Sequence, residues 1–276
     1  MCSILAGAFA LGLSHNPTRR DPARQAAAST PTDPAQAVAA DHPPSTATDT
    51  PPEPSPTPSP DEPTYPPLPP EEGGPFGSRM TTGSREVALT FDDGPDPRYT
   101  PQALALLREY DVKATFCLVG TNVTQYPELV REIVEDGHTL CNHSWSHDIG
   151  LGARAESTIW TDLYLTNEAI RDAVPGARIA YYRQPGGNWT SSVVAVARDL
   201  GMTPLHWTVD PQDWTLPGAG SIAATVTADT LPGDIVLLHD AGGNREGTVQ
   251  ALRTILPNLA RRFYLDALPT RSSEPS

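Results

Sequence analysis

The sequence predicts an α/β domain built from parallel βα units, preceded by a long region that lacks a hydrophobic core. From Arg85 onward, short β-rich runs alternate with amphipathic stretches of helical length, which is the pattern of parallel βα units. Polar clusters rich in Asp, His and Gly follow several of the β-rich runs, where strands of such a fold end. Residues 14–84, in contrast, contain no sustained apolar periodicity.

The chain of 276 residues is long enough for a mid-sized domain that folds without disulfide staples. The helix at 101–110 has a strong start signal, because Thr100 is a good N-cap and Pro101 suits the first helical position. The predicted strands are 86–91, 113–119, 138–142, 178–183, 202–209, 234–239 and 262–268, and the predicted helices are 101–110, 127–136, 156–174, 191–200, 221–230 and 248–261. This pattern alone fits either an open doubly wound sheet or a closed barrel.

The region before the domain is predicted to be an exported spacer. Residues 4–13 resemble the apolar core of a signal peptide, although no basic residue precedes them, and a membrane anchor is the alternative reading of residues 1–13. Residues 14–84 are predicted to be a disordered Pro/Thr/Ser-rich linker, and 269–276 a disordered tail. We therefore expect a secreted or cell-surface protein.

Charge and cysteine content narrow the classes of partner and compartment. A formal net charge of -14 argues against nucleic acid as a partner, because counterion release requires clustered Lys and Arg. Cys2, Cys117 and Cys141 are too few for a disulfide framework. The last two lie in apolar surroundings, so buried free thiols are favoured over a bridge between them.

Five polar clusters coincide with the predicted strand ends and together describe one site. Each cluster alone is compatible with an ordinary turn, because Asp, Gly, Pro and Asn are common in turns. The clusters are Thr-Phe-Asp-Asp-Gly at 90–94, His-Ser-Trp-Ser-His at 143–147, Arg-Gln-Pro-Gly-Gly at 183–187, Asp-Pro-Gln-Asp-Trp at 210–214 and Leu-Leu-His-Asp at 237–240.

The first two clusters contain a set of metal ligands. His143 and His147 are four residues apart, so on a helical turn both imidazoles would face one metal ion. Adjacent Asp92 and Asp93 would repel each other in one pocket, which predicts that one binds the metal and the other accepts a proton. A site with two histidines and one aspartate leaves coordination positions open, as catalytic metal sites do.

Open coordination positions on the metal allow a bound water to attack a substrate carbonyl, so hydrolysis is the predicted reaction. If the bond hydrolysed is an amide, an acid is also needed to protonate the leaving nitrogen. His239 ends an apolar strand and is a candidate for this acid, with a carboxylate such as Asp213 raising its pKa and fixing its tautomer. Arg183 is a candidate for orienting the catalytic base through charge-assisted hydrogen bonds.

In this order, the five clusters resemble the motifs of the polysaccharide deacetylase family, also called the NodB-homology family or carbohydrate esterase family 4. The resemblance covers about residues 85–268. It implies a distorted barrel of seven βα units, a divalent metal that is usually zinc, with cobalt or another divalent ion as alternatives, and removal of N-acetyl groups from an amino-sugar polymer. It identifies Asp92 as the base and His239 as the acid.

The resemblance further implies a role for each of the other site residues. Asp93, His143 and His147 would bind the metal, Arg183 would orient Asp92, and Asp213 would tune His239, with Asp210 as the less favoured candidate. Trp214 and Leu237 would line the groove and the acetyl pocket, and the backbone amide of Gly186 would help to stabilise the oxyanion. Many family members carry an aromatic residue where this chain has Gly186, so the backbone donor is kept and an aromatic wall is lost.

Two other functions are alternatives to N-deacetylation. A related enzyme could hydrolyse O-acetyl esters of xylan, a reaction that needs the acid His239 less. A module that only binds wall glycan could keep the fold without catalysis, although it would not need both His239 and Asp92. Peptidoglycan, chitin and chitooligosaccharide are all candidate substrates, and the sequence does not set the oligomeric state.

Overall fold

The computed structural model describes residues 67–270. The predicted signal or anchor segment at 1–13, the linker up to residue 66 and the tail from residue 271 lie outside the described residues. Within residues 67–270, no helix combines the length and the apolar character needed to cross a bilayer.

Six parallel strands form the sheet and confirm the predicted α/β class. The strands are β1 (Ala88–Asp92), β2 (Thr115–Leu118), β3 (Thr139–Asn142), β4 (Ile179–Tyr182), β5 (Thr203–Pro204) and β6 (Ile235–His239), in the order β5-β4-β3-β2-β1-β6. The sheet curls because the chain after β5 turns toward β6. Leu205 donates its N–H to the carbonyl of Tyr182, and Val209 donates to Ile235. The predicted strand 202–209 is therefore divided between two partners, its first part pairing with β4 and its last residue with β6.

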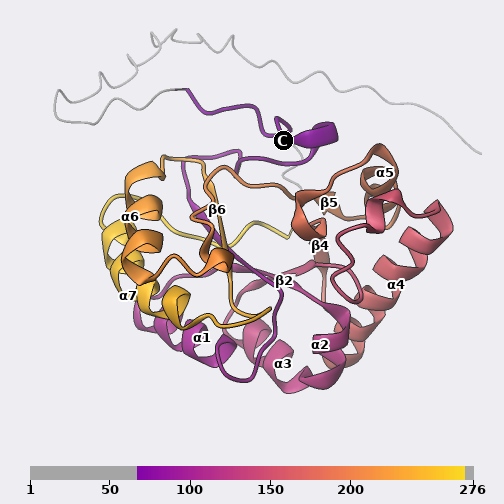
Figure 1. The fold of residues 1–276 in the computed structure, drawn as a ribbon, viewed down its shortest axis with the longest axis horizontal. Coiled ribbons are helices and arrows are strands. Elements are labelled where there is room, and N and C mark those ends of the chain that lie inside the picture. Colours follow the sequence, from indigo (N-terminus) through magenta and orange to yellow (C-terminus); the bar gives the residue numbers. More distant parts are fainter. Residues whose placement is uncertain (1–66, 271–276) are drawn as a thin grey trace, which may run out of the picture. The chain divides into compact units, whose positions relative to one another are not determined.

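Within residues 67–270, seven α-helices follow and flank these strands, and Figure 1 shows them on the outside of the curled sheet. They are α1 (Thr100–Glu109), α2 (Gly120–Gln125), α3 (Pro127–Glu135), α4 (Glu156–Ala173), α5 (Ser191–Asp199), α6 (Ala219–Asp229) and α7 (Glu246–Ala260). The short helix α2 is not predicted from the sequence. Thr100 is not the N-cap: it is the first residue of α1, and its hydroxyl contacts Asp96 and Asp240 instead.

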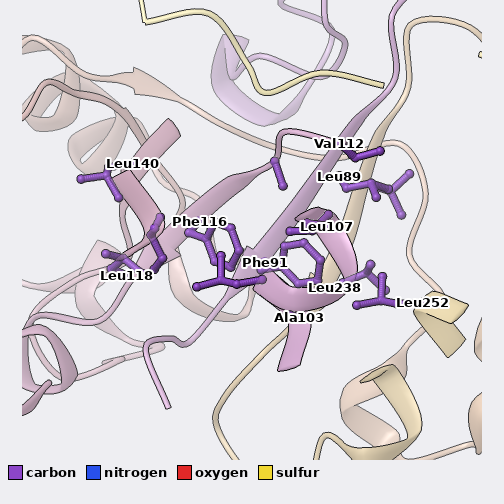
Figure 2. Packing of buried hydrophobic residues seen from close by; sticks show 14 of the residues in the cluster. Leu89, Phe91, Ala103, Leu107, Val112, Phe116, Leu118, Leu140, Leu238 and Leu252 are labelled. Carbon is purple, nitrogen blue, oxygen red and sulfur yellow. The ribbon is translucent and has the colours of Figure 1, made fainter. Parts of the chain in front are cut away.

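Alternation along the strands divides the apolar residues between two clusters. Leu89 and Phe91 of β1 face outward and pack against Leu107 of α1 and Leu252 of α7 (Figure 2). Ala88 belongs to a smaller cluster inside the curled sheet, together with Cys117, Cys141, Tyr181, Leu205, Ile235 and Leu268. Because successive residues of a strand point to opposite faces, every second residue of each strand faces this interior.

The predicted last strand, 262–268, is reduced to one parallel bridge between Val87 and Leu265. The physical reason is that β1 has no free edge. From Ala88 onward it pairs with β6 on one side, and from Thr90 with β2 on the other. The chain after residue 265 therefore leaves the strand direction, and Leu268 joins the interior cluster.

The packed domain begins before the predicted boundary at residue 85. Arg79 bridges Leu205 and Thr81 bridges Asp234, so this segment pairs with the chain beside β5 and β6. Ser78 and Thr81 are fully buried. Part of the predicted linker thus contributes backbone partners to the domain, a role that needs no apolar periodicity.

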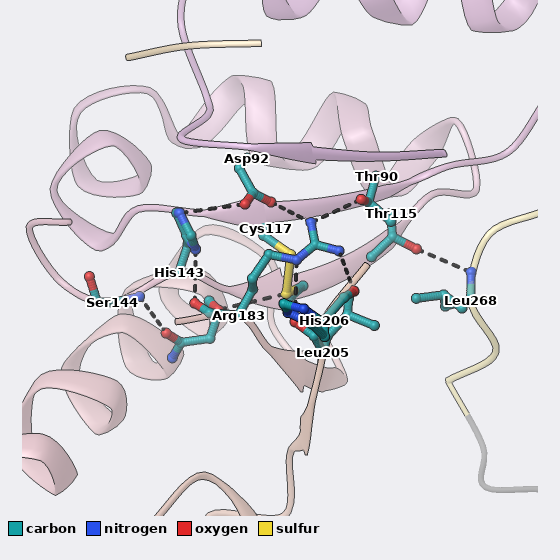
Figure 3. Close-up of a disulfide and its surroundings, with 12 residues drawn as sticks. Thr90, Asp92, Thr115, Cys117, His143, Ser144, Arg183, Leu205, His206 and Leu268 are labelled. Carbon is teal, nitrogen blue, oxygen red and sulfur yellow. Dashed lines mark hydrogen bonds and ion pairs between the residues drawn. A yellow bond between two sulfur atoms is a disulfide. The ribbon is translucent and has the colours of Figure 1, made fainter. Parts of the chain in front are cut away.

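Cys117 and Cys141 form a disulfide, so the prediction of free thiols is wrong (Figure 3). The two residues lie in register on the neighbouring strands β2 and β3. Both side chains face the interior of the sheet, and their Cα atoms are 4.1 Å apart. Two inward-facing cysteines at such a separation meet directly, whereas the sequence does not reveal that β2 and β3 share this register.

We expect this disulfide to contribute substantially to stability. Replacing both Cys117 and Cys141 by alanine should lower the free energy of unfolding by about 2–4 kcal/mol, because the bridge closes a loop in the unfolded chain. Urea denaturation of the double variant and the oxidised wild type would measure this difference. Unchanged stability in the double variant would contradict the prediction.

Candidate active site

The polar residues that follow the strands line one pocket of about 420 Å³. Its walls come from the ends of β1, β3, β4 and β6 and from the loop after β5. The lining residues are Asp92, Asp93, His143, His147, Gln184, Gly186, Gly187, Trp207, Asp210, Trp214, Leu237, His239, Gly242 and Arg245. Of the ten predicted site residues, only Arg183 and Asp213 lie outside this set, and both are buried next to lining residues.

The strand alternation explains why these side chains converge. Asp92 lies four residues after the inward-facing Ala88, and His143 lies two after Cys141. Arg183 follows Tyr181 by two, and His239 follows Ile235 by four. Each of these residues continues the inward-facing series of its strand past the apolar interior, to the carboxyl end where the pocket opens.

Asp93, His143 and His147 form a cluster able to hold a metal ion. Their ligand atoms all lie within 4.8 Å of one another. Asp93 Oδ1 is 3.2 Å from His147 Nε2 and 3.5 Å from His143 Nε2. This oxygen is buried and has no hydrogen-bond partner among the described residues. An orphaned buried carboxylate oxygen facing two imidazole nitrogens fits a divalent metal, and His and Asp are common zinc ligands.

The two histidines do not lie on a helical turn, contrary to the sequence argument. Ser144 and His147 both have positive φ, at 66° and 57°. Ser144 donates its N–H to the Asn142 side chain, and Trp145 donates to Asp162, so polar side chains hold the loop in this conformation. The rings still converge, with centroids 5.1 Å apart.

Hydrogen bonding fixes which nitrogen of His143 faces the site. Its Nδ1 lies 2.8 Å from the carbonyl oxygen of Arg183, which can only accept, so Nδ1 carries the proton. Nε2 is then the atom directed at Asp92 and Asp93. A histidine tethered through its other nitrogen in this way is typical of metal ligands.

Asp93 is held in its ionised form. Burial alone would raise the pKa of its carboxyl group. The close approach and positive charge of His143, together with the charges of His239 and His147, outweigh burial and lower this pKa to about 2. A carboxylate must be deprotonated to bind a metal, so Asp93 is prepared for that role.

The carboxylate of Asp92 lies between Arg183 and His143. The guanidinium donates to Asp92 Oδ1 at 2.7 Å and to the hydroxyl of Thr90 at 2.9 Å (Figure 3). Arg183 is fully buried, and it also donates to the carbonyls of Leu205 and His206. These bonds leave Asp92 Oδ2 on the side of His143 Nε2, 3.6 Å away.

His239 is paired with Asp213 and not with Asp210. Its Nδ1 is 2.7 Å from Asp213 Oδ1, and its backbone N–H donates to Asp213 Oδ2. Thr248 of α7 donates its hydroxyl to the same Oδ2 at 2.7 Å. Asp210 instead accepts the N–H of Gln212 within its own turn. Burial lowers the pKa of His239, but the hydrogen bond and charge of Asp213, with Asp92 and Asp93, outweigh it, so the pKa is raised.

This pairing predicts the pH dependence of catalysis if His239 acts as the acid. Because the pKa of His239 is raised, the protonated form persists above the ordinary range, and activity should fall only as the pH rises through that raised pKa. Asp213→Asn removes the negative charge, so the alkaline limb of kcat/KM should move to lower pH. Rate profiles of the variant and wild type would test this, and an unmoved limb would contradict it.

The three predicted groove residues, Gly186, Trp214 and Leu237, all line the pocket. Trp214 is 54% exposed, whereas Leu237 is buried in β6 opposite Thr90. Gly186 has φ 63° within the turn Pro185–Gly187. Sequence reasoning missed Trp207, Gly242 and Arg245, which also line the pocket. The last two lie in the loop after the predicted strand 234–239, a position that could have identified them.

Comparison with protein families places this site in a known context. The family model of polysaccharide deacetylase matches residues 79–205. A chitooligosaccharide deacetylase from Bradyrhizobium sp. (strain ANU 289) is 40% identical over 201 residues, which cover 68% of this chain and 91% of that relative.

Solved structures of carbohydrate esterase family 4 are also similar to this chain. A peptidoglycan N-acetylglucosamine deacetylase in complex with 4-naphthalen-1-yl-N-oxidanyl-benzamide superimposes with a TM-score of 0.65 and is 32% identical, covering 73% of this chain and 92% of the other. A pseudoenzyme of carbohydrate esterase family 4 from Bacillus anthracis has a TM-score of 0.63 and 29% identity, covering 68% and 66%.

Proposed function

Because the chain belongs to the polysaccharide deacetylase family, we propose that it hydrolyses the N-acetyl groups of N-acetylglucosamine residues in a glycan, using a divalent metal held by Asp93, His143 and His147. Membership of this family identifies the protein as a hydrolase that removes acetyl groups from carbohydrates. One observation carries the finer proposal: the three-residue ligand cluster shares its pocket with Asp92 and His239.

We propose zinc as the metal, which would supply a Lewis acid that activates water and polarises the acetyl carbonyl. Asp92 acts as the base. Arg183 occupies its Oδ1 at 2.7 Å, so Oδ2, beside the ligand cluster, is the atom that takes the proton of the attacking water. The buried guanidinium holds this carboxylate in one orientation, and three of its other hydrogen bonds prevent it from turning away.

His239 acts as the acid on the leaving nitrogen. Its Nδ1 proton is directed to Asp213, so Nε2 is the nitrogen available to protonate the amine. The backbone N–H of Gly186, at the pocket wall, stabilises the negative charge that develops on the carbonyl oxygen. Leu237 provides apolar surface for the acetyl methyl group, and Trp214 provides a ring face for the sugar.

The proposed substrates are chitooligosaccharide and the glycan strand of peptidoglycan, on which relatives named above act. We propose that the protein acts outside the cytoplasm, on a secreted or surface-held chain. The Cys117–Cys141 disulfide supports this location, because disulfides persist in oxidising compartments.

Acetate release tests the proposal directly. The purified protein would be incubated with N-acetylglucosamine oligomers, peptidoglycan and acetylated xylan, each with zinc and after chelation. We expect zinc-dependent release from the amino sugars. Release from xylan alone would assign the protein to the O-acetyl esterases. Metal binding without release from any substrate would favour the glycan-binding module.

A further inference from the structure

The loops that follow β1 and β6 interlock through two carboxylates and two glycines. The strands are neighbours, with Asp92 opposite His239. A Cβ atom added to Gly242 would lie 2.1 Å from Asp93 Oδ2, and one added to Gly94 would lie 2.7 Å from Asp240 Oδ1. The carboxylate of each loop therefore rests on a glycine of the other, at a distance that leaves no room for a methyl group.

Arg245 fixes the β6–α7 loop in the conformation that brings Gly242 to Asp93. Its Nε donates to the carbonyl of Ala241 at 2.5 Å, and its Nη2 donates to the carbonyl of Gly242 at 2.9 Å. The side chain is 4% exposed, so these bonds are shielded from water. Asn244 ties the same loop to Tyr99 beside α1.

Contact with Gly242 determines which oxygen of Asp93 faces the histidines. Oδ2 lies against the glycine, and Oδ1 is thereby directed to His147 and His143. The backbone of Asp93 is held separately, because Asn122 Nδ2 donates to its carbonyl at 2.8 Å. A methyl group at residue 242 would clash with Asp93 Oδ2. Rotation of the short Asp93 side chain would relieve this clash most easily, and it would also move Oδ1.

We propose that Gly242 and Arg245 are positioning residues for the metal ligand Asp93, an inference that rests on the proposed metal site. Gly242 supplies the close surface that orients the carboxylate, and Arg245 holds that surface in place. Neither residue needs to touch the metal or the substrate for this role.

Metal affinity of Gly242→Ala tests the first part, with Gly243→Ala as the matched control. Both glycines have positive φ, 72° and 141°, so both substitutions strain the loop. A Cβ at Gly243, however, meets nothing closer than Arg245 Nη2 at 3.6 Å. Calorimetric titration with Zn²⁺ should show an affinity loss of about 10- to 100-fold for Gly242→Ala and a much smaller one for Gly243→Ala. Equal losses would overturn the proposal.

Substitution of Arg245 tests the second part without adding bulk beside Asp93. Lysine keeps the charge but cannot grip two carbonyls with a planar fork. We therefore expect Arg245→Lys and Arg245→Gln to weaken Zn²⁺ binding to a similar extent and to alter the visible spectrum of bound Co²⁺. Wild-type affinity and spectrum in either variant would remove Arg245 from the proposal.

A double-mutant cycle on the metal-free protein separates this inference from the proposed function. Gly242→Ala should lower the melting temperature, and in an Asp93→Ala background the drop should shrink to about half or less, because the crowded oxygen is gone. An unchanged drop would refute the contact, even if the wild type binds zinc. A reduced drop in a protein that binds no zinc would support the contact and refute the proposed metal site.

Discussion

Asp92→Asn should reduce acetate release by about 10²- to 10⁴-fold, the range that a positioned base contributes, and leave metal binding intact. The amide of asparagine has nearly the same shape as the carboxylate and can still accept the bond from Arg183 Nη1. It cannot accept a proton at the atom that corresponds to Oδ2. Asp92 is not one of the three clustered ligands, so the affinity for zinc should stay close to that of the wild type.

The matched control is Asp210→Asn, which removes another carboxylate from the same pocket. Asp210 accepts the N–H of Gln212 within its own turn, and within residues 67–270 it forms no hydrogen bond with Arg183 or His239. Its substitution should change the rate far less. Single-turnover acetate release with zinc-saturated proteins would measure both variants, and wild-type turnover in Asp92→Asn would exclude Asp92 as the base.

Much of the site could be predicted because the strands have a fixed period. In a parallel sheet with one face closed to solvent, an inward-facing residue at the carboxyl end of a strand has only the pocket to face. Asp92, His143 and His239 each continue such a series, and this is visible once the strands are located in the sequence. The fold class follows from the same alternation.

The remaining features depend on contacts between segments that are distant in the sequence. The register that joins Cys117 to Cys141 is set by sheet pairing and has no local signal. The convergence of His143 and His147 depends on positive φ at two non-glycine residues, which the side chains of Asn142 and Asp162 support. The packing of Gly242 on Asp93 likewise requires β6 to lie beside β1.

His143→Ala should abolish both zinc binding and deacetylation. The side chain provides one of three ligand atoms, and its Nε2 also lies 3.6 Å from Asp92 Oδ2. Its removal also leaves the carbonyl of Arg183 without the Nδ1–H donor that the imidazole supplies. We expect zinc affinity to fall by more than about 10²-fold, beyond the loss typical of residues that only support a ligand.

His138→Ala separates the loss of a ligand from the loss of a buried imidazole. His138 is also buried, but it precedes β3, so it lies at the strand end opposite His143, and its Nδ1 accepts the N–H of Ala114. Burial lowers its pKa to about 4, so a neutral ring is lost in this variant. The orphaned N–H should cost about 1–3 kcal/mol of stability, while zinc binding is kept. Both substitutions remove a buried imidazole, but only His143→Ala removes a proposed ligand. Retention of zinc by His143→Ala would therefore refute the metal site.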